Sequence, residues 1–199
     1  MPDRFGDYDV LAKRGTPSWN AATRRVIDER LSLCEPAGIL DATQIATLRA
    51  LAMRIVPQPE GRPPVNVVAI LLHKLAAGHG DGYRHHALPP LLDAWRRGLD
   101  AIDDEARLRQ GCGFAQLPPA KADALLSAVE HAEVTSERWG DMPPTVFWQW
   151  RMLPDLVAAY WSHPSAWSAM GFGGPASPRG YVRLEVDRRD PWEAAERDG

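Results

Sequence analysis

"PPVNVVAILLHKLAAG", residues 63–78, is the stretch that decides the fold. Its prolines suit the first turn of a helix, where a missing N–H costs little, and its closing Gly78 suits the position just after a helix. Between these ends, residues 65–75 are apolar on almost every side of a helix, which is typical of a helix buried at the centre of a domain. The stretch therefore predicts an all-α protein.

Segments with apolar residues at helical spacing lie on both sides of this central helix. They are bounded by proline, glycine or capping residues, and they cover residues 17–34, 40–59, 88–110, 117–133 and 143–161. The second segment is predicted to begin at Asp41 with Gln44 completing a capping box. The last segment is predicted to split at Pro154, because its ring removes a hydrogen bond and clashes with the preceding turn.

The first segment is predicted to turn Val26, Ile27, Leu31 and Cys34 toward the core, with its charged residues on the opposite side. Only residues 181–186 alternate apolar and polar side chains as a strand does, and one strand cannot form a sheet. The sequence predicts one helical domain over residues 1–199, with about six helices joined by short proline- and glycine-containing loops.

The predicted domain consists of a helical core over residues 16–163 and a glycine–proline loop with an extended tail over residues 164–199. A chain of 199 residues is long enough for one well-buried domain and short for two. Its net charge of −3, without any run of five basic residues, argues against a nucleic-acid partner. Cys34 and Cys112 are too few for a disulfide scaffold, and the sequence leaves open whether they pair.

No stretch approaches the roughly 20 apolar residues that a membrane-spanning helix needs. The first 15 residues, "MPDRFGDYDVLAKRG", lack an apolar run after their charges and do not resemble a secretory signal. The sequence therefore predicts a cytoplasmic protein without direct membrane insertion. A periplasmic location is the alternative if a partner carries the chain out.

A histidine-rich turn is the first candidate for chemistry, because imidazole is a common metal ligand. The candidate ligands are His73, His79, Asp81, His85 and His86. Their spacing matches neither HExxH nor paired CxxC motifs, and glycines make the turn pliable. We predict no metal site, and a stand-alone metal-dependent enzyme that uses the His73–His86 cluster remains the alternative hypothesis.

Three further candidates for catalysis are weak. Ser162, Ser165 and Ser177 lie near His163, but no GxSxG elbow surrounds any of these serines. The loop "GFGGPASPRG", residues 171–180, lacks the strand and helix that a phosphate loop needs, and its two prolines remove amide donors. The carboxylates of "DAIDDEARLR", residues 100–109, are predicted to form a solvated helix face. No catalytic residue is predicted.

An excess of aromatic side chains near the C-terminal end is not explained by these candidates. The chain has eight tryptophans, and four of them lie between Phe147 and Phe172. A helix facing one core cannot bury both Trp148 and Trp150, because they lie about 200° apart around its axis. Either the chain's own C-terminal loop or another protein is expected to cover the second side, since uncharged aromatic patches are typical of interface cores.

The stretches "YWSHPSAWSAMGFGGPASPRGYVRL" (160–184), "YDVLAKRGTPSWNAATRRVIDERL" (8–31) and "GCGFAQLPPAKADALL" (111–126) resemble the gluconate 2-dehydrogenase subunit 3 family. This family contains the small subunits of bacterial membrane-linked sugar and sugar-acid dehydrogenases. The resemblance implies a mostly helical, non-catalytic, chaperone-like partner of a large flavoprotein of the glucose–methanol–choline oxidoreductase type. The large subunit would hold FAD, and this chain would hold no cofactor.

In several such systems a cytochrome c subunit accepts the electrons, and the small subunit carries a twin-arginine export signal. Here Arg24 and Arg25 lie inside a predicted helix without a following apolar segment, so the chain departs from that pattern. A helical interaction module for another kind of partner is a further alternative. The predicted interface with the partner consists of Trp148, Trp150, Tyr160, Trp161, His163, Pro164, Trp167, Phe172, Gly173, Gly174, Pro175, Ser177, Arg179, Tyr181 and Arg183.

Overall fold

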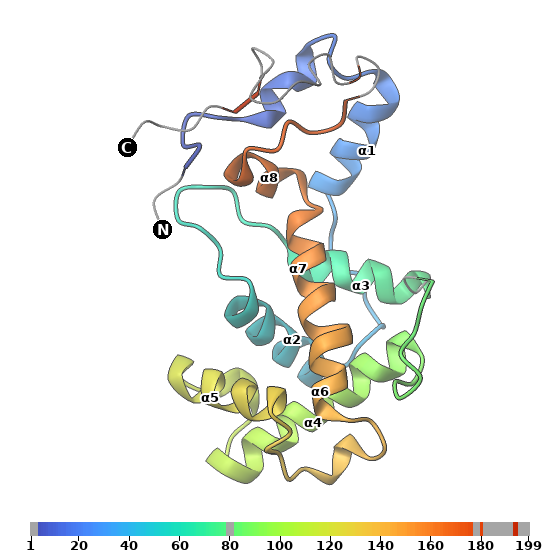
Figure 1. Ribbon diagram of the computed structural model, residues 1–199, viewed down its shortest axis with the longest axis vertical. Coiled ribbons are helices and arrows are strands. Elements are labelled where there is room, and N and C mark those ends of the chain that lie inside the picture. Colours follow the sequence, from blue (N-terminus) through green and yellow to red (C-terminus); the bar gives the residue numbers. More distant parts are fainter. Residues whose placement is uncertain (1–3, 79–81, 177–179, 181–192, 195–199) are drawn as a thin grey trace. The chain divides into compact units, whose positions relative to one another are not determined.

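A computed structural model describes residues 4–78, 82–176, 180 and 193–194. All regular structure in these residues is helical, with eight α-helices and short 3₁₀ and π turns (Figure 1). The all-α prediction is confirmed. Two of the helices, α6 (Pro144–Phe147) and α8 (Pro164–Trp167), are single turns that the sequence pattern merged into longer segments or missed. The strand-like residues 181–186 lie outside the described residues.

The chain divides into two compact units. One unit consists of Met1–Leu33, Pro59–Val65 and Tyr160–Gly199, and the other of Cys34–Gln58 and Asn66–Ala159. We call them the terminal unit and the central unit.

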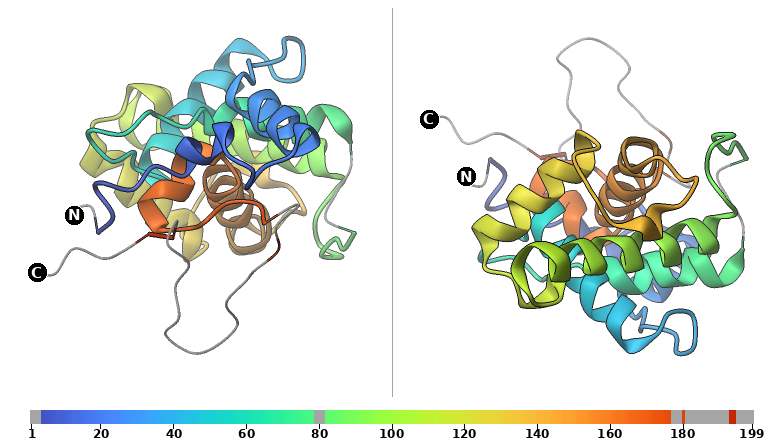
Figure 2. Two further views of the ribbon diagram at one scale, coloured as in Figure 1. Left: turned by 90° about the horizontal axis from the view of Figure 1, so that it is seen from above. Right: turned by 90° about the horizontal axis from the view of Figure 1, so that it is seen from below.

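The central unit is built around α4 (Leu91–Gln110), which packs against α2 (Ala42–Ile55), α3 (Val67–Ala77), α5 (Pro119–Glu130) and α6 (Figure 2). The large, fully buried side chains of this unit include Leu48, Leu51, Leu71, Leu72, Leu88, Trp95, Leu99, Ile102, Phe114 and Phe147. The central position predicted for the apolar segment 65–75 is consistent with this core, since α3 buries residues on several of its sides.

Local sequence signals place the helix ends of the central unit as predicted. The Asp41 side chain accepts a hydrogen bond from the Gln44 N–H, and the Gln44 side chain accepts one from the Asp41 N–H, which completes the capping box. Gly78 ends α3 in the left-handed conformation with φ +65°, and Gly111 ends α4 with φ +74°. Glycine adopts these angles without the steric cost that a Cβ would add.

The terminal unit packs α1 (Ala21–Leu31) and the 3₁₀ helix η1 (Val10–Gly15) against α8. Its small core consists of Val10, Trp19, Ile27 and Trp167. The predicted apolar face of α1 is only partly correct, because Ile27 is buried whereas Val26 and Leu31 are exposed. Among the described residues, α1 packs against α8, which is a single turn of helix. The contact with α8 can therefore bury only a narrow strip of α1.

The predicted break at Pro154 is wrong. A π-helical turn (Trp148–Met152) continues directly from α6 into α7 (Leu153–Trp161), and the Leu153 N–H bonds to the carbonyl of Trp148. A π turn inserts an extra residue, so the helix can accommodate a proline that cannot donate to the usual carbonyl. The helical course therefore passes Pro154 without stopping.

The solvated carboxylate face predicted for α4 is also wrong for two of its members. Asp103 and Glu105 are buried. Asp103 accepts a hydrogen bond from the Phe114 N–H at 2.9 Å, and Glu105 accepts bonds from the N–H groups of Thr135 and Ser136. These carboxylates satisfy backbone groups of the connecting loops, a long-range role that helix periodicity cannot reveal.

Cys34 and Cys112 form no disulfide in the structure, which answers the question that the sequence left open. Among the described residues, none of the helices has the length and apolar character that crossing a bilayer requires.

Candidate partner interface

The glycine–proline loop of the predicted interface contacts the N-terminal segment of its own chain. Three hydrogen bonds hold it within the terminal unit. Lys13 Nζ donates to the Gly173 carbonyl at 2.8 Å, Trp19 Nε1 donates to the Pro175 carbonyl at 3.1 Å, and the Val10 N–H donates to Ser168 Oγ at 3.1 Å. We call residues 168–176, held in this way, the clasp.

Gly174 is a point of the clasp where the backbone comes close to buried side chains. It has φ +73°, and a Cβ there would lie 3.0 Å from Val10 Cγ2 and 3.1 Å from Trp19 Cζ2. Gly174, one of the predicted interface residues, thus approaches the core of its own chain closely. The clasp thus brings together parts of residues 8–31 and of residues 160–184, which are two of the stretches that carry the family resemblance.

Gly174→Ala is expected to destabilise the protein by about 1–3 kcal/mol, because alanine would be strained at positive φ and would press on Val10 and Trp19. Gly173→Ala is the matched control from the same loop. Its Cβ would meet only the flexible Lys13 Nζ, at 3.4 Å. Urea unfolding of both variants checks the prediction, and equal stability of the two would contradict it.

His163 lies inside the terminal unit. It is buried and caps α8, and its Nδ1 accepts a hydrogen bond from the Ser165 N–H at 3.2 Å. Burial lowers the pKa of this imidazole below its ordinary value of 6.5, while a hydrogen bond with the backbone of Arg30 opposes the shift. The neutral ring is therefore the form that the fold favours.

This lowered pKa predicts a pH-dependent stability. The unfolded chain binds a proton at His163 before the folded chain does, so stability is lost as the pH falls from about 7 to about 5. His163→Asn keeps a capping side chain without titrating in this range. The variant is expected to lose less stability than the wild type between these pH values in urea unfolding, and an unchanged pH dependence would contradict the assignment.

The predicted interface rings fall into two groups. Trp148, Tyr160 and Trp167 are buried by the chain itself, as is Pro164. The exposed rings are Trp150 (41%), Trp161 (41%) and Phe172 (39%). The aromatic excess left for a partner is therefore smaller than the sequence suggested. Ser177, Arg179, Tyr181 and Arg183 lie outside the described residues, and the interface role of the whole set stays a prediction.

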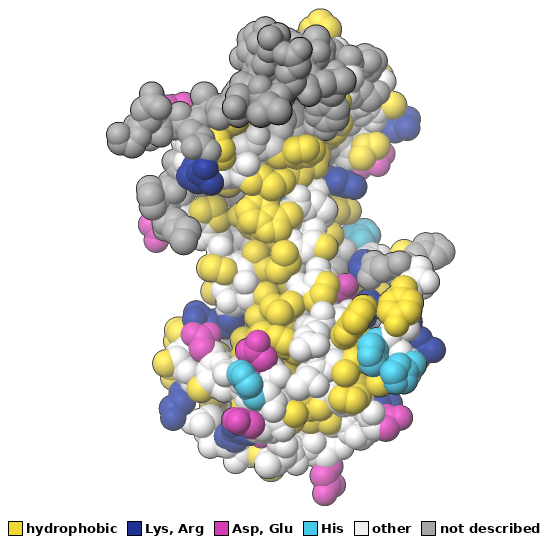
Figure 3. All heavy atoms as spheres, viewed as in Figure 1, with side chains coloured by type: hydrophobic (Ala, Val, Ile, Leu, Met, Phe, Trp, Pro, Cys, Tyr) yellow, Lys and Arg dark blue, Asp and Glu magenta, His cyan; other side chains and the backbone are white. Residues whose placement is uncertain are grey.

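Trp150 lies in a surface cluster of the central unit that the sequence did not predict as a whole. Its ring centroid is 5.8 Å from that of Tyr83 and 5.4 Å from that of His85, and His85 stacks on His86 at 4.6 Å. Figure 3 shows histidine side chains beside hydrophobic ones on this face of the molecule. Tyr83 was missed because it stands alone in a glycine-rich turn, without any periodicity to mark it.

The same histidines were the candidates for a metal site. His73 points elsewhere, with Nε2 3.0 Å from the Cys34 carbonyl oxygen. In the part of the chain that the structure describes, His, Cys, Asp and Glu side chains form no group of three placed to hold a metal ion. His79 and Asp81 of the predicted cluster lie outside that part.

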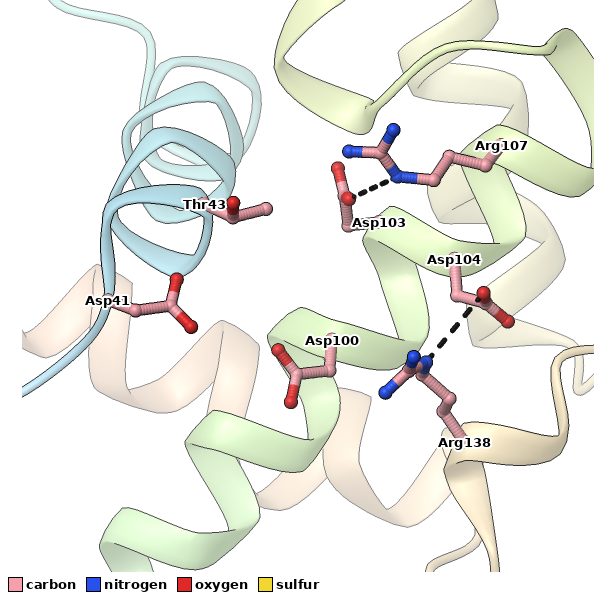
Figure 4. A pocket seen from close by; sticks show the side chains of 7 residues that line it. All are labelled: Asp41, Thr43, Asp100, Asp103, Asp104, Arg107 and Arg138. Carbon is pink, nitrogen blue, oxygen red and sulfur yellow. Dashed lines mark hydrogen bonds and ion pairs between the residues drawn. The ribbon is translucent and has the colours of Figure 1, made fainter.

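A shallow pocket of about 340 Å³ collects four carboxylates of the central unit (Figure 4). Its lining consists of Asp41, Thr43, Asp100, Asp103, Asp104, Arg107 and Arg138. Arg107 pairs with Asp103 at 2.9 Å and Arg138 with Asp104 at 3.7 Å, while Asp100 accepts a bond from Gln44. Each of these carboxylates already has a structural role, so the pocket gives no basis for acid–base chemistry.

One of three comparisons with known proteins supports the family resemblance. No significant match to the chain is found among curated proteins or among solved structures. The family model described as gluconate 2-dehydrogenase subunit 3 matches residues 42–174. The match covers helices α2 to α8 and continues through most of the clasp. The chain therefore belongs to the gluconate 2-dehydrogenase subunit 3 family.

Proposed function

We propose that this chain is a non-catalytic small subunit that binds and stabilises a large FAD-dependent oxidoreductase of the glucose–methanol–choline type. The large subunit would oxidise a hydroxyl group of a sugar, glycoside or sugar acid, and FAD would reside there. The membership of the subunit 3 family carries this proposal. The cytoplasmic location and the cytochrome c partner stay predictions.

Two features of the structure support the proposal. The titratable groups of the described pocket are committed to ion pairs and hydrogen bonds within the chain, and the buried His163 caps a helix. Trp150, Trp161 and Phe172 nevertheless remain about two-fifths exposed. Surface tryptophans are enriched where one protein binds another, so the chain has the features of a binding partner more than those of a catalyst.

Co-expression with a large flavoprotein encoded beside this chain tests the proposal. We expect a stable yellow complex that oxidises sugars or sugar acids with an artificial electron acceptor. The large subunit expressed alone is expected to be less soluble or less active, since it lacks the stabilising contacts. The isolated small chain is expected to be colourless and without turnover.

Two results would contradict the proposal. One is a large subunit that folds, holds FAD and turns over equally well without this chain and never co-purifies with it. The other is sugar oxidation by the small chain alone.

A further inference from the structure

The helical segment that contains the π turn and α7 has its charges on the inside. Arg151 and Asp155, its only two charged residues, are buried. Asp155 accepts hydrogen bonds from Lys74 Nζ at 2.9 Å and from Trp95 Nε1 at 2.8 Å. These bonds fix the charged side of the helix toward the core of the central unit.

The opposite side of this helix is exposed and has no charge. Within the central unit, the exposed residues from position 149 onward are Gln149, Trp150, Pro154, Val157 and Ala158. The last four are spaced as one face of a helix, and we call them the apolar stripe. Figure 3 shows a run of hydrophobic side chains over the part of the molecule that Figure 1 labels α7. A helix facing water normally shows the reverse pattern.

The aromatic cluster extends the stripe beside Trp150. Tyr83 is 63% exposed and its ring contacts that of Trp150. The surface thus combines aliphatic residues, a proline and two large amphipathic rings, and the exposed side of the helix carries no charged residue. Interface cores have this composition, with aromatic residues enriched and charged residues depleted.

We propose that the apolar stripe, with Tyr83, is the surface on which the large dehydrogenase subunit docks, through an uncharged, apolar surface of its own. This inference rests on the proposed function, since membership of a family of subunits is what supplies a protein partner. Because the stripe is uncharged, the surface of the partner that covers it should be uncharged as well. A charged side chain buried against the stripe would lose its hydration without gaining an opposite charge from this helix.

A lipid surface fits the stripe less well than a protein does. Helices that lie on membranes carry lysine and arginine on the face beside their apolar side. The only basic residue from position 144 to 161 is Arg151, which is buried toward Asp155. The helix itself therefore supplies no exposed cationic side chain that would hold the stripe on anionic lipid.

Val157→Asp in the full chain tests the proposal directly. The substitution places a charge at the middle of the stripe, at a position that is already 39% exposed. We expect the amount of co-purified large subunit to fall about tenfold or more, because a buried unpaired charge costs well over the 1.4 kcal/mol that a factor of ten requires. Trp150→Ser, which removes the largest ring of the stripe, is expected to act in the same direction.

Met53→Asp is the matched control. Met53 is 72% exposed on α2, so the control makes the same kind of change at a more exposed apolar position of the central unit. We expect co-purification to stay at the wild-type level. Thermal unfolding of the isolated variants should show that Val157→Asp and Met53→Asp both fold, since neither replaces a buried side chain.

The outcomes separate this inference from the proposed function. Undiminished co-purification of Val157→Asp and Trp150→Ser would overturn the docking surface while leaving the subunit role intact. Failure of the wild type itself to bind the large subunit would overturn both. The docking assignment would also fall if light scattering showed a dimer of the isolated chain that Val157→Asp abolishes, or if the wild type but not the variant floated with phosphatidylcholine–phosphatidylglycerol vesicles.

Discussion

Asp155→Ala is expected to destabilise the protein by about 3–5 kcal/mol, because it breaks a buried ion pair from one side. The carboxylate is 2% exposed and bonds to both Lys74 and Trp95. Its removal leaves the indole N–H of the fully buried Trp95 without this acceptor and takes the negative charge away from Arg151. Urea unfolding of the purified chain measures the loss.

Two variants show whether burial is the cause. Asp155→Asn keeps an acceptor for Trp95 but removes the charge, so its loss should be intermediate. Asp123→Ala removes the partner of Arg54 in a pair on the protein surface, where solvent screens the interaction, and should change stability little. If Asp155→Ala lowered the free energy of unfolding no more than Asp123→Ala does, the assignment of Asp155 to a buried ion pair would be contradicted.

Gly98→Ala is expected to destabilise the protein by about 1–3 kcal/mol, although alanine is favoured over glycine inside a helix by about 1 kcal/mol. A Cβ at position 98 of α4 would lie 2.3 Å from Phe147 Cζ. The Phe147 ring cannot move away easily, because it is fully buried with Trp95 and Trp139 at centroid distances of 5.5 and 5.9 Å.

A double-mutant cycle with Phe147→Leu identifies the clash. The smaller side chain should relieve the strain, so the double variant should be more stable than the sum of the two single effects predicts. Gly15→Ala serves as a control, since nothing lies within 4 Å of its Cβ and its φ is not positive. Strict additivity, or a stabilising Gly98→Ala, would show that the packing of α4 on α6 is looser than described.

The features of the fold that depend only on residues close together in the sequence could be predicted. The capping box at Asp41 and the glycines after α3 and α4 act within one turn of the chain, so their residue types suffice to place helix ends. The passage of the helix through Pro154 could not be predicted in this way. A π turn before the proline changes which carbonyls need a donor, and packing in the core decides whether it forms.

The direction of the charged residues was a second feature beyond local reasoning. Arg151 and Asp155 have the spacing of an exposed helix pair, and the usual interpretation places such a pair in water. The residues that bond to Asp155 lie 81 and 60 positions away in the sequence. Periodicity within the segment contains no information about Lys74 and Trp95, so it cannot show that this helix has its charged side buried.

The position of the glycine–proline loop could not be predicted for the same reason. The glycine–proline loop was interpreted as a surface for a partner, but Lys13 and Trp19, more than 150 residues earlier in the chain, hold it in place. Trp150 is 41% exposed, and its place in the interface stays a prediction. Val157 and Pro154 share its exposed side, which their residue types alone do not reveal; the burial of Asp155 shows which side of the helix faces outward.

The recovery of the chain from its native cells tests the subunit role most directly. The chain is tagged and purified at a low detergent concentration without cross-linking. The eluate is then examined for a flavoprotein and for flavin absorbance. We expect the wild type to co-purify with a large FAD-containing oxidoreductase in stoichiometric amounts. The oxidoreductase should be depleted with Val157→Asp but not with Met53→Asp. A colourless eluate that contains only the small chain as a monomer would contradict the account.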